Sequence, residues 1–245
     1  MALAAVILAA GQGTRMTSDL PKVLHSVGGK PIVSHVIDTV KEIPADRICV
    51  VVGYKAEMVE DACKETGVEF VLQEQQFGTG HAVLQCKKAL ENFEGTMIVL
   101  NGDVPALRSS TIRSFIGHHQ ALSASATVLT AMISDPTGYG RIVRDEGRAL
   151  LKIVEEKDAS PEIRKIREIN SGLFCFEKSE LFRALGEVNR DNVQNEYYLT
   201  DVIAVMKKNG LRVGAYCVED CGEVAGVNTD EELESMRKHF EGTKL

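Results

Sequence analysis

The feature that most constrains this chain is an apolar run that ends abruptly in two glycines. The run covers residues 2–10, and Gly11 and Gly13 follow it. A short buried strand that enters a glycine-rich turn lets backbone N–H groups approach phosphate oxygens closely. Arg15 in the loop and Lys22 just beyond it would neutralise phosphate charge. The segment therefore predicts a phosphate-binding loop, and a tight strand-to-helix connection without a ligand is the alternative.

The spacing excludes two common nucleotide motifs. No Gly-Lys-Ser or Gly-Lys-Thr triplet follows at the interval that a P-loop requires, and Met16 stands where the dinucleotide fingerprint needs its third glycine. The net charge of −7 over 245 residues argues against a nucleic-acid partner. An acidic chain that binds phosphates must gather its cations locally or use a metal ion.

Composition predicts a cytoplasmic location and no membrane partner. The N-terminal run lacks a basic flank, and no apolar run approaches the length of a membrane span. The six cysteines contain no Cys-x-x-Cys pair and are expected to be reduced, mostly core, thiols. His118 and His119 are expected to be solvated. The sequence leaves a homo-oligomer open.

Short β-rich runs alternate with amphipathic stretches up to residue 135. Val33, Val36, Ile37 and Val40 give one such stretch helical spacing. This alternation predicts an α/β fold: a Rossmann-like, mostly parallel sheet with helices on both faces. The expected strands span residues 4–10, 47–52, 69–73, 96–100 and 125–132, and the expected helices span 32–41, 56–65, 81–90 and 110–119.

The pattern changes after residue 135. A hairpin is expected over 140–144 and 150–155, around the turn at Asp145-Glu146-Gly147. Strands are expected at 168–176 and 211–218, helices at 180–185, 198–209 and 229–240, and an exposed charged segment at 158–167. Thr229 and Glu232 have the spacing of a capping box. We expect one domain, 1–245, with lobes of about 1–135 and 136–230 and the helix 229–240.

Asp103 is a candidate Mg²⁺ ligand. It follows the expected strand 96–100, and ligands of open α/β sheets collect at the carboxyl ends of the strands. A carboxylate in that place beside a phosphate loop suits Mg²⁺. A turn carboxylate that caps the next segment is the alternative.

Gln73, Gly78 and Thr79 could recognise a flat base. The glutamine amide offers both a donor and an acceptor, which suits the edge of uracil, and the glycine lets a ring lie against the backbone. From this segment alone, a surface glutamine followed by a helix that Thr79 caps is the simpler interpretation.

Gly140, Glu155, Asn170 and Asn228 each have an ordinary interpretation as a turn, a solvated charge or a polar residue near a strand or helix end. Their chemistry becomes specific only as a set. Glutamate and asparagine side chains could hold sugar hydroxyls and an amide, and an asparagine carbonyl can join an aspartate on a metal.

Taken together, the motifs resemble the uridyltransferase domain of bacterial N-acetylglucosamine-1-phosphate uridyltransferases. The matching strings, in chain order over residues 8–228, are LAAGQGTRM, LPKVL, QEQQFGTGHA, NGDVP, DPTGYGRI, IVEEKDA, EINSG, NEYYLTD and EVAGVN. The combination is highly specific, whereas the first string alone marks the wider sugar-phosphate nucleotidyltransferase superfamily. Asn101, where some relatives carry an aromatic residue, and Ser171, where threonine is usual, depart from the pattern.

The resemblance implies a role for each candidate residue. Arg15 and Lys22 would grip the triphosphate, and Asp103 and Asn228 would ligate Mg²⁺. The uracil side of the site would comprise Ala9, Ala10, Gly11, Gln73 and Gly78, with Gly13 also in the substrate-binding loop. The N-acetylglucosamine side would comprise Thr79, Gly140, Glu155 and Asn170.

The implied reaction joins UTP to N-acetylglucosamine-1-phosphate and releases UDP-N-acetylglucosamine and pyrophosphate. Another sugar-1-phosphate, dTTP as the nucleotide, or a catalytically silent sugar-nucleotide sensor are the alternatives. The bifunctional members of this family continue into a β-helix of hexapeptide repeats that transfers acetyl groups. Residues 1–245 contain no such repeats, so we expect this chain to show no acetyltransfer.

Overall fold

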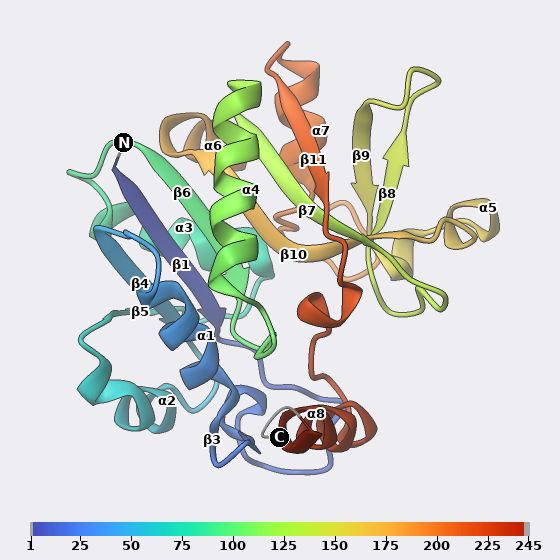
Figure 1. The fold of residues 1–245 in the computed structure, drawn as a ribbon. Helices are drawn as coiled ribbons and strands as arrows, with labels where there is room; N and C mark the ends of the chain where they lie inside the picture. The colour runs from blue at the N-terminus through green and yellow to red at the C-terminus, as the bar shows by residue number, and fades with distance from the viewer. Residues whose placement is uncertain (1, 243–245) are drawn as a thin grey trace.

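A nine-stranded sheet forms the centre of the computed structural model, which describes residues 2–242 (Figure 1). The strand order is β11-β7-β10-β6-β1-β4-β5, with β8 beside β10 and β9 beside β8. The strands are β1 (Leu3–Ala9), β4 (Arg47–Val52), β5 (Glu69–Leu72), β6 (Thr96–Asn101), β7 (Ala126–Met132), β8 (Arg141–Arg144), β9 (Leu150–Val154), β10 (Glu168–Glu177) and β11 (Val213–Cys217). Residues 1 and 243–245 of the expected domain lie outside the described part of the chain.

Most strands of this sheet run in the same direction. β1 pairs in parallel with β4 and β6, as does β4 with β5 and β7 with β11. β10 is antiparallel to β6, β7 and β8, and β9 is antiparallel to β8. The expected mostly parallel sheet and the expected hairpin are therefore confirmed.

Helices cover both faces of the sheet (Figure 1). On one face, α1 (Ile32–Lys41), α2 (Ala56–Cys63) and α4 (Ser109–Leu122) supply apolar side chains to one core. On the other face, α3 (Thr79–Ala89), α6 (Lys178–Leu185) and α7 (Asp201–Lys208) build a second core. β1 is buried almost throughout because it lies between these two layers, which explains its continuous apolar run.

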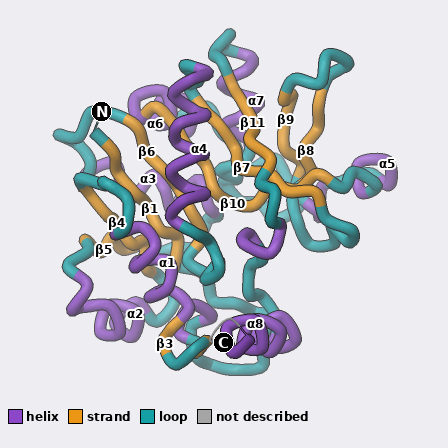
Figure 2. The backbone as a smooth tube through the Cα atoms, in the orientation of Figure 1, coloured by secondary structure: helices purple, strands orange, loops and turns teal. Residues whose placement is uncertain are grey.

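The last helix lies apart from the main sheet. Figure 2 shows α8 (Asp230–Gly242) beside the small antiparallel pair of β2 (Ser26–Val27) and β3 (Lys30–Pro31). Met16, Val27, Ile32, Val227, Leu233 and Met236 form a third apolar cluster there. A four-residue helix, α5 (Pro161–Arg164), occupies the expected charged segment.

Most element boundaries agree with the sequence, and two helix starts differ for a tertiary reason. The expected helix 198–209 begins only at Asp201. The Leu199 amide donates to Thr79 Oγ1 at 3.1 Å, and the Tyr198 hydroxyl donates to Asp158 Oδ2 at 3.1 Å. The contact between Leu199 and Thr79 also helps to start α3 at Thr79, two residues before the expected start.

His119 contradicts the expectation of a solvated histidine. It is 1% exposed, and its Nδ1 lies 2.8 Å from Thr127 Oγ1 on β7. The helix α4 extends three residues beyond the expected end, and His119 lies on its buried face together with Ile112 and Phe115. Four cysteines are buried free thiols, whereas Cys217 and Cys221 are exposed.

Candidate active site

Two adjoining cavities open at the sheet edge where β1 and β6 end. Because these strands are parallel and adjacent, the residues that follow them emerge side by side. The reversed strand β10 begins at the same edge, and β9 ends there next to the start of β8. The topology therefore gathers segments that are distant in the sequence.

The first cavity, which we call the Gln73 cavity, has a volume of about 340 Å³. It collects most residues expected on the uracil side together with Lys22. Its lining comprises Leu8, Ala9, Ala10, Gly11, Lys22, Val23, Gln73, Gln76, Gly78, Thr79, Ala82, Asn101, Asp103, Glu196 and Asn228.

Gln73 is a buried wall of this cavity and not a surface residue. It is 2% exposed, and its Nε2 donates to the Gly78 carbonyl at 3.1 Å. Nε2 also lies 3.0 Å from His81 Nδ1, and burial lowers the pKa of His81, which favours the neutral ring that can accept this bond. Within the described residues Oε1 has no such partner, so an acceptor remains for a ligand.

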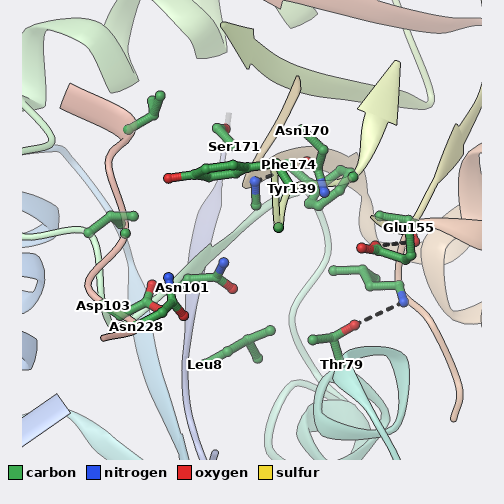
Figure 3. Close-up of a pocket in the computed structure, with 18 of the residues that line it drawn as sticks. Leu8, Thr79, Asn101, Asp103, Tyr139, Glu155, Asn170, Ser171, Phe174 and Asn228 are labelled. Carbon is green, nitrogen blue, oxygen red and sulfur yellow. Dashed lines mark hydrogen bonds between the residues drawn. The ribbon is translucent and has the colours of Figure 1, made fainter. Parts of the chain in front are cut away.

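The start of α3 is held against the segment 197–199. Gly78 has φ +102°, and a Cβ there would lie 2.7 Å from the Tyr197 carbonyl oxygen, so only glycine fits. Gly80 donates to the same carbonyl at 2.8 Å. Gly78 is the N-cap residue, so the expectation that Thr79 caps this helix is wrong. The Thr79 hydroxyl accepts from Leu199 instead (Figure 3).

The second cavity, which we call the Glu155 cavity, has a volume of about 200 Å³. It collects all four residues expected on the sugar side. Its lining includes Arg15, Thr79, Thr137, Gly138, Tyr139, Gly140, Glu155, Asn170, Ser171, Phe174, Thr200 and Gly226.

Glu155 and Asn170 both lie close to Gly140: a Cβ on Gly140 would lie 3.3 Å from Glu155 Oε2 and 3.5 Å from Asn170 Cβ. The Thr200 hydroxyl donates to Glu155 Oε1 at 2.9 Å. The backbone N–H of Asn170 donates to the Gly140 carbonyl at 2.8 Å. Burial raises the pKa of Glu155, and the nearby carboxylates of Asp201, Asp158 and Glu196 raise it further, while the Thr200 bond opposes them. This carboxylate is a strong acceptor for hydroxyl groups.

The two cavities share one wall, formed by Leu8, Thr79, Asn101, Asp103 and Asn228. Figure 3 shows Asp103, Asn101 and Asn228 grouped on one side of the view. The Lys22 ammonium forms an ion pair with Asp103 Oδ2 and donates to Asn228 Oδ1 at 2.8 Å. A charged cluster therefore stands at the junction of the cavities.

The donors at this junction fit a divalent cation. Asp103 Oδ1 is buried without a hydrogen-bond partner, and the Asn228 carbonyl oxygen accepts from the Lys22 ammonium that also contacts Asp103 Oδ2. Residues 2–242 contain no group of three or more His, Cys, Asp or Glu side chains that could hold a metal. Mg²⁺ often uses only one or two protein oxygens and takes its other ligands from water and phosphates, so this pair suits it.

Arg15 and Gly13 do not line the Gln73 cavity. Arg15 lines the Glu155 cavity, near Gly138, and not the Gln73 cavity. Gly13, with φ +74°, packs against the Lys22 side chain and is in neither lining. The triphosphate contact expected of Arg15 and the substrate contact expected of Gly13 stay predictions.

Tyr139 and Phe174 were not singled out from the sequence, and both line the Glu155 cavity. Burial raises the pKa of Tyr139, so its hydroxyl stays protonated and can donate a hydrogen bond. The turn-rich loop around Tyr139 was a signal for it. Phe174 had no local signal, because an aromatic residue in an apolar strand is indistinguishable from a core residue.

Comparison with known proteins identifies relatives over almost the whole chain. A family model described as the MobA-like NTP transferase domain matches residues 5–169. The bifunctional protein GlmU of Enterococcus faecalis is 47% identical over 234 residues, which are 96% of this chain and 51% of that protein. GlmU of Lactobacillus johnsonii is 51% identical over 223 residues, which are 91% of this chain and 48% of that protein. The chain thus spans about half the length of these curated relatives.

Solved structures share the fold at low sequence identity. A UDP-glucose pyrophosphorylase complexed with UDP-glucose has a TM-score of 0.77 and 18% identity, with 99% of this chain and 100% of that chain covered. A putative glucose-1-phosphate thymidylyltransferase from Bacillus anthracis has a TM-score of 0.77 and 22% identity, with 98% of this chain and 95% of that chain covered.

Among residues 2–242, no helix is both long and apolar enough to cross a membrane.

Proposed function

Because this chain belongs to the family of MobA-like NTP transferase domains and is a nucleotidyltransferase, we propose that it transfers the uridylyl group of UTP to N-acetylglucosamine-1-phosphate. The products would be UDP-N-acetylglucosamine and pyrophosphate. The motifs along residues 8–228 support this pair of substrates within the family.

The shared wall between the two cavities carries the proposal. A nucleotide in the Gln73 cavity and a sugar phosphate in the Glu155 cavity would meet at Asp103, Asn228 and Lys22. This is where the bond between two phosphates must form. The proposal assigns the nucleotide to the lobe of about 1–135 and the sugar to the lobe of about 136–230.

The chemistry requires positioning and charge stabilisation. A phosphate oxygen of the sugar phosphate attacks the α-phosphorus of UTP, and the bond from that phosphorus to the β-phosphate bridging oxygen breaks. The nucleophile is already anionic, so no general base is needed. Lys22 and Arg15 would offset the charge of the triphosphate, and pyrophosphate leaves with the electron pair of the broken bond.

Asp103 and Asn228 would hold Mg²⁺ at the junction. A bound Mg²⁺ supplies positive charge beside the reacting phosphates. The buried, unpartnered Oδ1 of Asp103 supports this assignment. Lys22 contacts Asp103 and Asn228 and lines the Gln73 cavity, where its ammonium could donate hydrogen bonds to a phosphate instead of to these two residues. Six free cysteines support a reducing cytoplasm as the site of action.

A pyrophosphate-release assay over a panel of nucleotides and sugar-1-phosphates tests the proposal. We expect the highest kcat/KM for UTP with N-acetylglucosamine-1-phosphate. Asp103→Asn keeps the side-chain size and should reduce turnover by on the order of 10²-fold, as when one electrostatic stabiliser is removed. A different preferred pair would point to another sugar phosphate or to dTTP, and binding without turnover would point to a sensor.

Selection of uracil should depend on Gln73. The free Oε1 acceptor matches the N3–H donor of uracil, whereas cytosine presents an acceptor at N3. An unpaired buried group costs about 1–3 kcal/mol, or roughly 10- to 100-fold in affinity. We therefore expect the highest kcat/KM for UTP, a lower kcat/KM for dTTP and a negligible one for CTP. Gln73→Ala should reduce the ratio of kcat/KM between UTP and CTP. An unchanged ratio would mean that the backbone alone recognises the base.

A further inference from the structure

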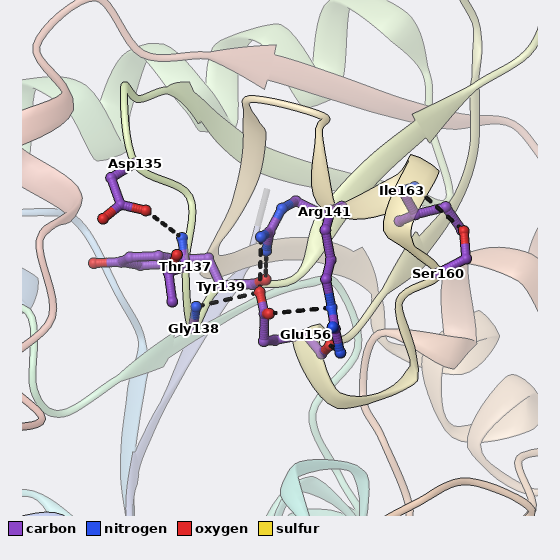
Figure 4. A network of polar contacts seen from close by, with 9 residues as sticks. Asp135, Thr137, Gly138, Tyr139, Arg141, Glu156, Ser160 and Ile163 are labelled. Carbon is purple, nitrogen blue, oxygen red and sulfur yellow. Dashed lines mark hydrogen bonds and ion pairs between the residues drawn. The ribbon is translucent and has the colours of Figure 1, made fainter.

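We propose that the ion pair between Arg141 and Glu156 is a positioning device that fixes the loop 137–140 over the Glu155 cavity and so sets the affinity for the sugar phosphate. Figure 4 shows Glu156 bonded both to Gly138 of the loop and to the Arg141 guanidinium. The link to sugar affinity rests on the proposed function, whereas the fixing of the loop does not.

The ion pair contacts the loop backbone at two points. Arg141 Nη2 lies 2.7 Å from Glu156 Oε2, and its Nη1 donates to the Tyr139 carbonyl. The same Glu156 oxygen accepts from the Gly138 amide at 3.3 Å. One donor and one acceptor of the loop are thus tied to a single pair of side chains. Gly138, Tyr139 and Gly140 all line the cavity, so the pair determines the shape of that wall.

The burial of Arg141 favours a positioning role over a stabilising one. Its side chain is 2% exposed, and its Nε is buried without a hydrogen-bond partner. Taking a guanidinium out of water is costly, and a buried ion pair is often no more stable than an apolar pair of similar size. Unlike an apolar pair, this ion pair forms directed hydrogen bonds to the Tyr139 carbonyl and the Gly138 amide.

Two consecutive residues that follow β9, Glu155 and Glu156, have different roles: one lines the cavity and the other holds the loop. Glu155 bonds to Thr200 and lines the cavity, whereas Glu156 bonds to the loop on the other side. Contacts within the loop also shape it. Gly138 has φ +85°, and the Thr137 backbone N–H donates a hydrogen bond to Asp135 Oδ1 at 3.1 Å. Losing Glu156 therefore leaves the loop without its outer support while Glu155 stays in place.

Hydrogen–deuterium exchange of the ligand-free protein tests the fixing of the loop. In Glu156→Ala, we expect amides of the segment 135–141 to exchange at least about tenfold faster, because a lost hydrogen bond corresponds to about that factor in an opening equilibrium. Glu168→Ala is the matched control: it removes the ion pair of Arg144, on the same hairpin, which contacts neither cavity. Unchanged exchange in Glu156→Ala, or an equal increase in Glu168→Ala, would overturn the proposal.

Steady-state kinetics test the consequence for substrate affinity. For Glu156→Ala we expect the KM for the sugar phosphate to rise about tenfold or more, with the KM for UTP within about twofold of wild type. The double variant Arg141→Met/Glu156→Leu removes the uncompensated buried charge, so its melting temperature should recover while the sugar-phosphate KM stays high. Recovery of both together would assign the pair a structural role only.

The outcomes separate this inference from the proposed function. If the wild-type protein turns over a different sugar phosphate, the same KM comparison is made with that substrate. If it turns over none, the proposed function fails, and the exchange experiment still decides whether the ion pair fixes the loop.

Discussion

The ammonium of Lys22 contacts both residues that would hold a divalent cation, through Asp103 Oδ2 and Asn228 Oδ1. Lys22→Ala should therefore have two opposite effects. The kcat/KM for UTP should fall about 10- to 150-fold, because a charged hydrogen bond contributes roughly 1.5–3 kcal/mol. Binding of Mn²⁺ to the nucleotide-free protein should become tighter, because the competing cation is gone, and electron paramagnetic resonance measures that affinity.

Lys30→Ala is a suitable control for Lys22→Ala. It removes the same charge from an exposed pair with Asp38. Neither kcat/KM nor Mn²⁺ affinity should change in this variant. If Lys22→Ala leaves the kcat/KM for UTP unaltered, Lys22 is only an ion-pair partner of Asp103.

Glu155 should link sugar binding to a cost in stability. Burial raises its pKa above the ordinary value of 4.5, so its favourable contribution to folding exists below pH 4.5 and is lost as the pH rises through the raised pKa. Glu155→Gln keeps an acceptor for Thr200 without the charge. We expect a higher melting temperature than wild type at pH 8, and no gain below pH 4.5.

The same variant should raise the KM for the sugar phosphate about 10- to 100-fold, because charged hydrogen bonds to hydroxyls are lost. Glu91→Gln, on an exposed residue, controls for the loss of one negative charge. A melting temperature at pH 8 that is no higher than wild type would contradict the unfavourable burial of this carboxylate.

At the residue level, the sequence predicts the location of a side chain when the neighbouring residues form a recognisable strand or helix. Asp103 follows a recognisable strand, so its location at the sheet edge could be inferred. Gln73 ends an expected strand, but its segment alone favoured a surface glutamine, and only the family resemblance implied a place in the site. Tyr139 and Phe174 could not be assigned, because the cavity that they line depends on how β10 and the loop before β8 come together. His119 was misjudged because it lies on the same buried face of α4 as Ile112 and Phe115, and a polar residue at the end of the expected helix gave no sign of this.

At the element level, the local hydrophobic pattern decided most boundaries. The helix 32–41 and the strand 47–52 agree with the structure, because each has one clear periodicity and a clear end. The segment 198–200 reads as helix in isolation but is turn in the protein. Its Tyr198 and Leu199 form hydrogen bonds to Asp158 and Thr79, which are distant in the sequence. Such contacts override helical propensity and leave no trace in a local window.

The capping box of α8 connects this helix to the proposed metal ligand Asn228. Glu232 Oε2 accepts from the amides of Thr229 at 3.1 Å and Asn228 at 2.6 Å, and the Glu232 amide donates to Thr229 Oγ1 at 3.2 Å. Thr229→Ala should cost about 1 kcal/mol of folding free energy. The melting temperature, measured by calorimetry, should fall roughly 2–4 °C for a chain of this size.

Glu232→Ala should destabilise α8 similarly and, in addition, release the backbone of Asn228. We therefore expect turnover to fall further in Glu232→Ala than in Thr229→Ala, with a higher metal concentration needed for half-maximal activity. Equal metal dependence in the two variants would show that the cap holds the helix but not the ligand.

At the scale of the whole molecule, one reversed strand brings the two halves together. β10 inserts between β6 and β7 and belongs to the second half of the chain, whereas β6 belongs to the first. The alternating pattern predicted a parallel sheet, but it could not predict which strands would be neighbours. The junction of the cavities depends on this insertion, because Asn170 at the start of β10 comes to the edge where β6 delivers Asp103.

A ligand that spans this junction should stabilise the protein more than a ligand that fills one cavity. Under the proposed function, UDP-N-acetylglucosamine contacts both cavities and UDP only the first. At 100 times its dissociation constant, a ligand adds about 2.7 kcal/mol to the free energy of unfolding. For a protein of this size that corresponds to a rise in melting temperature of roughly 5–10 °C.

UDP and N-acetylglucosamine-1-phosphate at the same concentrations should each give a smaller rise, because each lacks the contacts of the other cavity. Differential scanning fluorimetry in the presence of Mg²⁺ measures all three shifts. In Glu155→Gln the extra stabilisation by UDP-N-acetylglucosamine over UDP should shrink, while the shift with UDP itself stays unchanged. If the wild-type shifts with UDP and UDP-N-acetylglucosamine are equal, the sugar does not occupy the Glu155 cavity, and the division of the site between the two halves of the chain is wrong.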